Sequence, residues 1–317
     1  MDAAHFPTDF DSDSRFLERQ ASKKPDRMNY LTSKLRLMIY KKTPISFTRL
    51  SFILILAIAI AAWATIFIQG DTGFLDLFIS QTWSNASRFA SNMVGSNYSE
   101  TPAFLLLDRW MATGILAYET LCMSIIAIFI SGLLAITTML PAARNISIGQ
   151  RSSFTGAISY YIVRLSYAFS RAVPELIWAL IIVFFLSPGV LAGALALALH
   201  NFGIIGRLTA ETVENIDTKP IDALKSSGAS NIQIFLYGIL PQTLPQFLTY
   251  SLYRWEVIIR TTVVIGFVGA GGLGKEFILR LNWFHYTDVS LIIVWYVILV
   301  TSVDIISFWL RKLARFE

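Results

Sequence analysis

Charged residues are scarce in this sequence. Asp, Glu, Lys and Arg make up only 15% of its 317 residues, whereas 55% are hydrophobic. A soluble globular domain carries about 25% charged residues, so the composition argues against a soluble domain and indicates a membrane protein. The net charge of +5 does not indicate nucleic-acid binding, because the basic residues gather toward the two ends of the chain, beside its apolar part.

Cysteine and histidine are also rare. The single cysteine, Cys122, lies in an apolar run, which excludes an intrachain disulfide. The three histidines, His5, His200 and His285, are far apart and form no metal-ligand pattern. A membrane-embedded enzyme would need a catalytic constellation at membrane depth, and the sequence shows no H-E-x-x-H motif, no paired aspartates and no notable Ser/Lys dyad there. We therefore expect a protein that is not an enzyme and holds no metal.

Long apolar runs fill most of the chain. A helix needs about 20 apolar residues to cross a ~30 Å hydrocarbon core, so these runs predict an all-α, polytopic membrane protein with about six transmembrane helices. We place the spans at 50–68, 113–140, two arms of a hairpin that starts near Ala172 and turns at Ser187-Pro188-Gly189, 243–268 and 289–310. Residues 142–171 mix arginines with aromatic residues, which favours an amphipathic helix on the inner membrane surface.

The basic residues orient these spans. Most of the 26 lysines and arginines lie on one predicted side, which the positive-inside rule assigns to the cytoplasm, together with both termini. The predicted parts are a cytoplasmic N-terminal extension (1–49), the first span with an outer loop (50–112), a core (113–311) and a cytoplasmic tail (312–317). Composition favours a solvated extension, with phosphate or lipid binding as the alternative.

Residues 209–241, which we call the elbow, form a polar segment between apolar runs. Pro220 suits the start of a helix, and Gly228 can adopt the left-handed conformation that ends one. Ser230 can cap a second helix, which we expect to stop at Leu240-Pro241. The segment therefore predicts two short helices joined by a sharp corner.

The elbow resembles the cytoplasmic EAA loop of bacterial ABC importer permeases, in which Glu-Ala-Ala is followed by Gly and then by Leu-Pro. The matching residues are Asp222-Ala223-Leu224, Gly228 and Leu240-Pro241. Asp222 replaces the usual Glu, Leu224 replaces the second Ala, and Gly238 stands where Ile is usual. The resemblance implies a MetI-like permease core with cytoplasmic coupling helices that dock in a groove of a separate ATPase.

This resemblance assigns the ATPase coupling to one set of residues, namely Asp217, Ile221, Asp222, Ala223, Leu224, Lys225 and Gly228. We expect Ile221 and Leu224 to supply apolar contact to the ATPase, and Asp222 and Lys225 to supply charge. Because Asp222 has a shorter side chain than Glu, a salt bridge from it is closer or weaker.

Further stretches resemble the permeases of phosphonate importers. They lie at 171–180, 195–201, 211–217 and 260–274, within a resemblance that covers about residues 113–311. It implies a bacterial inner-membrane permease for phosphonate, phosphite or hypophosphite, which a periplasmic binding protein delivers. It also implies a second permease chain, identical or different, and a cytoplasmic ABC ATPase dimer that uses ATP and Mg. The chain itself is expected to contact membrane lipids and to bind no cofactor and no nucleic acid.

The glycine-rich segment 269–276 matches two nucleotide-binding motifs, G-x-G-x-x-G and G-x-x-x-x-G-K. Both require a strand–turn–helix context, and Glu276 stands where the second requires Ser or Thr, so we reject both. Irregular backbone at membrane depth persists only where it is buried in protein or lines a cavity. Gly269, Gly271 and Gly272 therefore predict a broken segment beside the translocation path, with plain helix packing through small residues as the alternative.

Three charged residues, Arg254, Glu256 and Arg260, lie within the predicted fifth span. Each unpaired charge costs about 2.5–3.5 kcal/mol at the centre of a bilayer. Glu256 and Arg260 are spaced to pair on one helix face, which leaves Arg254 without a local partner. Because a guanidinium can grip phosphoryl oxygens bidentately, we hypothesise that Arg254 or Arg260 lines the translocation path. The alternative is an interhelical ion pair that only holds the spans together.

Two other functions stay open. One is an ABC importer permease for a different small solute, such as an amino acid. The other is an ATP-independent carrier, which would usually show internal repeats with matched broken helices. We find no convincing repeat in this chain.

Overall fold

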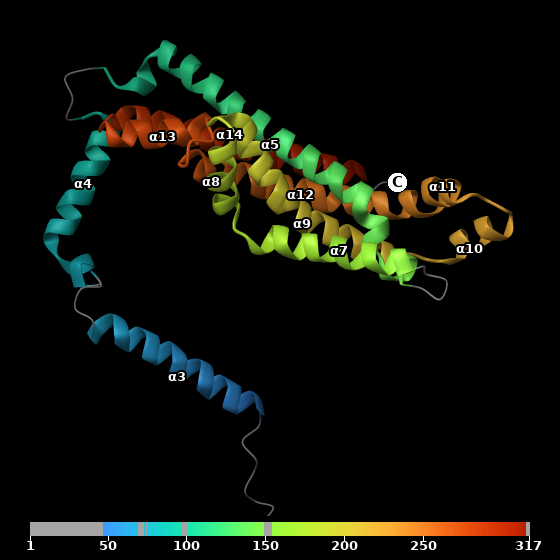
Figure 1. Cartoon of the computed structure of the whole chain (residues 1–317). Helices are drawn as coiled ribbons and strands as arrows, with labels where there is room; N and C mark the ends of the chain where they lie inside the picture. Colours follow the sequence, from blue (N-terminus) through green and yellow to red (C-terminus); the bar gives the residue numbers. More distant parts are fainter. Residues whose placement is uncertain (1–46, 69–72, 74, 97–100, 149–153, 315–317) are drawn as a thin grey trace, which may run out of the picture. The chain divides into compact units, whose positions relative to one another are not determined.

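The computed structural model describes residues 47–314 except 69–72, 74, 97–100 and 149–153 (Figure 1). The chain divides after Trp83 into two units, each taken by itself below. The predicted N-terminal extension lies outside the described residues except for its last three, 47–49. The described residues are helical and contain no strand, as the sequence predicts.

The first unit contains one long helix, α3 (Phe47–Ile68), and a short 3-10 turn, η1 (Leu75–Phe78). α3 is apolar on every side, and none of its residues is buried. Its 22 residues reach about 33 Å, the thickness of a bilayer core. The first predicted span is therefore confirmed as a helix of sufficient length and apolarity.

The second unit is a helical bundle organised around α9 (Val190–Glu214), against which α5, α7, α8 and α12 all pack. The other elements, of which α4 begins in the first unit, are α4 (Ser80–Val94), η2 (Ala103–Leu105), α5 (Leu107–Ala142), α6 (Arg144–Ser147), α7 (Phe154–Ala172), α8 (Glu175–Phe185), α10 (Lys219–Ser226), α11 (Asn231–Gln233), the π-helical turn η3 (Ile234–Ile239), α12 (Leu240–Gly266), α13 (Gly272–Asn282) and α14 (Tyr286–Ala314).

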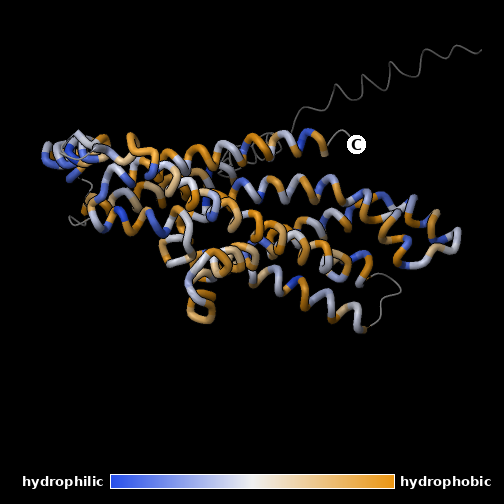
Figure 2. Tube along the Cα trace, turned by 90° about the horizontal axis from the view of Figure 1, so that it is seen from above, coloured by the Kyte–Doolittle hydropathy of each residue, from blue (hydrophilic) through white to orange (hydrophobic). Residues whose placement is uncertain are grey.

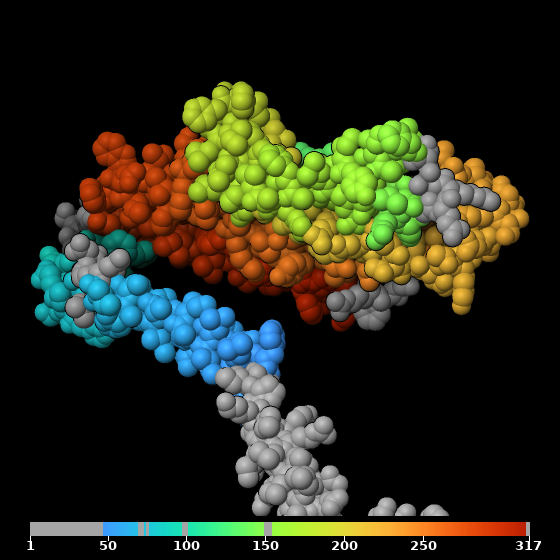
Figure 3. Space-filling view, turned by 60° about the horizontal axis from the view of Figure 1, so that its bottom comes forward, coloured from blue at the N-terminus to red at the C-terminus, as the bar shows by residue number. Residues whose placement is uncertain are grey.

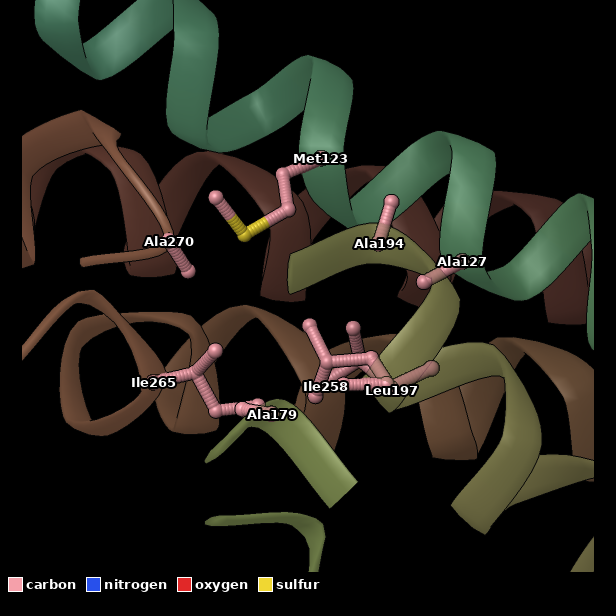
Figure 4. Packing of buried hydrophobic residues seen from close by; sticks show 9 residues of the cluster. Met123, Ala127, Ala179, Ala194, Leu197, Ile258, Ile265 and Ala270 are labelled. Atoms are coloured by element: carbon pink, nitrogen blue, oxygen red, sulfur yellow. The ribbon is translucent and has the colours of Figure 1, made fainter. Parts of the chain in front are cut away.

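Small residues let α9 approach its neighbours closely. Ala194 of α9 meets Met123 and Ala127 of α5 in one buried cluster (Figure 4). A Cβ added at Gly193 would lie 2.7 Å from the Cβ of Ala270. Packing through small residues is how helices associate within a membrane, where the lipid is as apolar as the side chains.

Four described helices, α3, α5, α9 and α14, are each long and apolar enough to cross a membrane. α7 and α8 meet the same criterion only together, and they bend by 97° at the break between them. α12 has 27 residues but carries the three charges noted above. The described residues therefore provide four such helices, or five if the bent pair forms one span. Figure 2 shows hydrophobic residues along most of these helices.

The predicted arrangement of the spans is partly wrong. α7 packs along α9 and α5 with Tyr167 fully buried, whereas the sequence suggested a helix on the membrane surface. α8 has only 11 residues, about 16 Å, so the first arm of the predicted hairpin is too short to cross a bilayer by itself. The break follows from Pro174, which has no N–H to continue α7.

α5 also differs from its predicted bounds. It begins at Leu107 rather than at 113, and it runs through Pro141 to Ala142. A proline so close to the end interrupts only the last hydrogen bonds of a helix, so α5 continues through Pro141 for one more residue.

Candidate functional site

The first arm of the elbow is α10, with Pro220 in its first turn. Its end has the two hydrogen bonds of a Schellman motif, from Ala229 N–H to the Leu224 carbonyl (3.0 Å) and from Gly228 N–H to the Lys225 carbonyl (3.1 Å). Gly228 has a φ of +83°, which glycine adopts without steric cost. The predicted helix end at Gly228 is confirmed.

The second arm starts at a capping box. Ser230 Oγ accepts from the Gln233 N–H (3.4 Å), and Gln233 Oε1 accepts from the Ser230 N–H (2.8 Å). The predicted stop at Leu240-Pro241 is wrong, because α11, η3 and α12 follow one another without a break. In the π-helical turn the Leu240 N–H bonds to the carbonyl of Phe235, five residues back. This wider turn admits Pro241, which has no N–H to donate.

The inner face of α10 is apolar and faces the chain itself. Ile221 is buried, and Leu224 packs beside it against Ile234 and Ile239 of the second arm. The expectation that Ile221 and Leu224 offer an apolar surface to a partner is therefore corrected: their side chains hold the two arms together. A helix of eight residues is too short to be stable by propensity alone, so this packing is what fixes it.

Gly238, the departure from the family pattern, lies under this contact. A Cβ at Gly238 would lie 3.1 Å from Leu224 Cδ1 and 3.4 Å from Ile221 Cγ1. A larger residue at 238 would push α10 away from the second arm. The large side chains of α10 and the missing side chain at 238 thus fit one another.

The outer face of the elbow is polar and exposed. Asp217, Asp222, Ala223 and Lys225 are all exposed, and Lys225 Nζ lies 3.4 Å from Asp222 Oδ1. Figure 3 shows this gold-coloured segment at one end of the second unit. A pair this exposed adds little stability, so both charges are available to a partner.

The base of the elbow is anchored where α9 ends. Glu214 Oε1 accepts from Arg164 Nη2 (2.6 Å) and from the backbone N–H of Arg144 (2.7 Å). Gln242 Nε2 donates to the carbonyl of Gly238 (2.7 Å). Helices α6, α7 and α9 therefore hold the start of the elbow, and α12 holds its end.

The charges of α12 pair across helices. Arg260 Nη2 donates to both carboxylate oxygens of Asp304 on α14 (2.9 and 2.8 Å), and Glu256 accepts from Arg311 of the same helix. The predicted pairing of Glu256 with Arg260 is wrong, because α14 supplies a closer partner to each. The Arg260–Asp304 pair stays open, with side chains 49% and 39% exposed.

Arg254 contacts α9 instead of α14. Its Nε donates to Asn201 Oδ1 (2.8 Å), and Asn201 is buried. The neighbouring His200 lies against Glu175 at the start of α8. Sequence reasoning did not assign roles to Glu175, His200 or Asn201, although each lies in a stretch that carries the resemblance to phosphonate permeases. The polar character of these three residues within apolar runs was the available signal.

The glycine-rich segment is a turn between α12 and α13. Gly269, Gly271 and Gly272 have φ values of +95°, +86° and +64°, so the predicted break in the helix is confirmed. Thr120 Oγ1 of α5 accepts from the Leu273 N–H (2.9 Å) at the start of α13. Helices flank the turn on both sides, which removes the strand that either nucleotide motif requires.

Close backbone contact secures this turn. A Cβ at Gly266 would lie 2.6 Å from the Cα of Gly274, and a Cβ at Gly274 would overlap the carbonyl oxygen of Val263. Both interpretations of the glycine-rich segment thus apply, since some glycines break the helix and others allow close helix packing. The position of this turn beside a translocation path stays a prediction. The described residues include no cluster of His, Cys, Asp and Glu that could hold a metal ion.

Residues 145–315 match a family described as "Binding-protein-dependent transport system inner membrane component". The chain belongs to this family. It is 37% identical over 194 residues to the phosphite transport system permease protein PtxC of Stutzerimonas stutzeri, a match that covers 61% of this chain and 68% of that protein. It is 30% identical over 207 residues to the phosphate-import permease protein PhnE of Mycolicibacterium smegmatis, covering 65% of this chain and 38% of that protein.

A solved structure shares the fold of this chain. A chain of the MetNI methionine ABC transporter, in an inward-facing conformation, aligns with a TM-score of 0.56 at 21% identity. The alignment covers 64% of this chain and 95% of that one. The MetI-like core expected from the sequence is therefore confirmed.

Proposed function

We propose that this chain is the permease subunit of an ABC importer and forms the pathway for a phosphonate-type oxyanion, namely phosphonate, phosphite or hypophosphite. The names of its relatives support the substrate class. The observation that carries the coupling role is the elbow, whose two arms are locked to each other while the charged outer face of α10 stays exposed.

The assembly that fits this role has two permease chains, identical or different, a cytoplasmic ATPase dimer and a periplasmic binding protein. The ATPases bind ATP and Mg, and this chain binds no cofactor. Both termini and the elbow face the cytoplasm, as the basic residues indicate. The half-exposed Arg260–Asp304 pair supports a second chain or an aqueous pathway at this face, because an ion pair facing lipid would be costly.

Force would enter at the outer face of α10. Closure of the ATPases on ATP displaces α10, and the packing of Ile221 and Leu224 passes the displacement to the second arm. That arm continues without interruption into the 27 residues of α12, about 40 Å of helix. α12 carries Arg254 and Arg260 and ends at the glycine-rich turn. A rigid shift of one helix past its neighbours is a common way to switch a pathway.

Arg254 and Arg260 would offer positive potential to the anion along this route. Arg260 uses Nη2 on Asp304 and Arg254 uses Nε on Asn201. Within the described part of the chain, these are the hydrogen bonds that the two guanidinium groups donate. Their remaining N–H groups suit transient contact with phosphoryl oxygens.

Reconstitution tests the proposal. The chain is placed in proteoliposomes with its ATPase inside and its binding protein outside, and ATP hydrolysis and uptake are measured with phosphite, hypophosphite, methylphosphonate, phosphate and D-methionine. We expect stimulation and uptake with one or more of the first three. Stimulation by D-methionine alone, or by phosphate alone, would assign the chain to another solute, and uptake without ATP would make it a carrier.

The amino-acid alternative has one observation in its favour, the fold shared with a methionine transporter. Fold does not determine the substrate, since one architecture serves many solutes. Co-purification distinguishes the carrier alternative, because a carrier is isolated alone whereas a permease brings an ATPase with it.

A further inference from the structure

Helix α4 has an apolar face that no described part of the chain covers. The residues of this face recur at the spacing of one side of a helix, namely Trp83, Ala86, Ala90 and Val94. All four are exposed, Trp83 by 68% and Val94 by 66%, and no residue of α4 is buried. The opposite face is polar and carries the one charge of the helix, Arg88. α4 is therefore amphipathic, but the described chain provides no core for its apolar face.

The end of α4 is fixed beside the start of α14. Ser290 Oγ of α14 donates a hydrogen bond to the carbonyl oxygen of Met93 (2.6 Å). The ring of Phe89 meets the ring of Tyr286, the first residue of α14, edge-on, with the two centroids 5.4 Å apart. α14 is long and apolar enough to cross a membrane, so its first turn marks the level at which the chain enters the bilayer. These contacts hold α4 at that level.

Exposed aromatic residues lie at the same level. Trp283 and Phe284, just before α14, are 70% and 66% exposed, and the ring of Phe284 also contacts that of Tyr286. Exposed aromatic residues at the end of a span are typical of the membrane–water interface. Arg311 and Lys312 occupy the last turn of α14, and the positive-inside rule assigns that end to the cytoplasm. α4 therefore ends in an aromatic belt on the outer side.

The composition of α4 favours lipid over a protein partner. Its polar face is built from Ser, Asn and Gln, and Arg88 Nη2 already donates to Asn85 Oδ1 (2.7 Å). A protein partner is selected largely through complementary charge, which this helix does not offer, whereas a lipid surface requires an apolar face at the right depth. An isolated helix of 15 residues is also marginal in water, so contact with lipid would stabilise it.

We propose that α4 lies flat in the outer membrane interface, with Trp83, Ala86, Ala90 and Val94 at the boundary between lipid headgroups and acyl chains. The partner of this face is the lipid surface itself. Through Met93 and Phe89 the helix then holds the start of α14 at the bilayer surface. The side of the membrane follows from the orientation proposed above, whereas the contact with lipid does not depend on which solute the chain carries.

Spin labels on single cysteines test the contact. The full chain with Cys122→Ser is placed in nanodiscs of phosphatidylethanolamine and phosphatidylglycerol, with a nitroxide at Ala86→Cys or Ala90→Cys on the apolar face. Ser84→Cys and Arg88→Cys, on the polar face, are the matched controls. We expect the first two labels to lie about 5–10 Å below the lipid headgroups and to collide with oxygen more than with a water-soluble nickel chelate. The two control labels should show the reverse preference.

Two results would overturn the proposal. If all four labels prefer the nickel chelate, α4 lies in water. If the labels at 86 and 90 are shielded from both reagents, a protein surface such as a second copy of this chain covers the face in place of lipid.

Hydrogen exchange gives a second measurement that needs no label. Ala86→Glu with Ala90→Glu places two charges on the apolar face, and the α4 amides should then exchange about tenfold faster or more, the factor that burial of one large apolar side chain represents. Ser84→Glu with Ser91→Glu adds the same charge to the polar face and should leave the exchange rates unchanged. Equal exchange in the two double variants would contradict an apolar face held in lipid.

Discussion

Replacing Gly228 with valine should uncouple ATP hydrolysis from import. Gly228 has a φ of +83°, and nothing lies within 4 Å of a Cβ built there. The cost of the substitution is therefore conformational, with no steric clash against neighbouring atoms. It amounts to about 1–2 kcal/mol for an ordinary L-residue in this region, with a β-branched side chain at the upper end or above.

A loss of this size lowers the ratio of intact to melted corner by about 5–30-fold. The assay is the number of anions imported per ATP hydrolysed in proteoliposomes. We expect Gly228→Val to keep basal ATP hydrolysis and to lower this ratio at least about fivefold. Gly228→Asn is the matched control, because asparagine tolerates the left-handed conformation, and it should retain most of the coupling. Equal coupling in the valine variant and the wild type would refute the role of the corner.

Three further substitutions test the packing and the charges. Gly274→Ala should destabilise the detergent-solubilised chain by about 3 kcal/mol or more, because the new Cβ overlaps backbone atoms. Gly189→Ala is the control, since open space surrounds Gly189, and it should leave the melting temperature unchanged. Equal melting temperatures for these two variants would contradict this prediction. Thr120→Val keeps the side-chain shape but leaves the buried N–H of Leu273 without an acceptor. The free energy of unfolding, measured by chemical denaturation, should therefore fall by about 1–3 kcal/mol. An unchanged denaturation midpoint would contradict this prediction. Arg260→Gln should reduce import. The reduction should persist in the double variant with Asp304→Asn, which removes the carboxylate that Arg260→Gln leaves unpaired. If the pair is purely structural, the double variant should import as well as the wild type.

The corner of the elbow could be predicted from the sequence because its rules are local. Gly228 and Ser230 act through backbone groups a few residues away, and the observed caps are the expected ones. The end of the second arm could not be predicted in the same way. Proline normally stops a helix, and only the π-helical turn before Pro241 lets it continue.

The partners of the charged residues were beyond local rules. Glu256 pairs with a residue 55 positions away and Arg260 with one 44 positions away. A spacing of four predicts contact on one helix, but it says nothing of a neighbouring helix with a better-placed partner. For the same reason, the sequence did not predict that Ile221 and Leu224 face the second arm of the elbow. The room that Gly238 leaves for these side chains matters only once the second arm lies beneath Ile221.

The bend between α7 and α8 shows a third limit. A run of apolar residues indicates a segment at membrane depth, but it does not show how packing against neighbouring helices divides that segment into separate helices. Pro174 marked a boundary, but the 97° turn depends on how α7 and α8 each pack on α9.

The most direct test of the coupling role places one cysteine on the outer face of the elbow. Ala223 is exposed, and the chain has a single native cysteine, Cys122, so Ala223→Cys in a Cys122→Ser chain carries one probe. In membranes that contain the assembled importer, the new thiol should react with impermeant reagents only from the cytoplasmic side. It should also cross-link to the ATPase with a yield that changes when ATP binds. Labelling from the outer side, or no cross-link to the ATPase in an importer that still transports, would contradict the account.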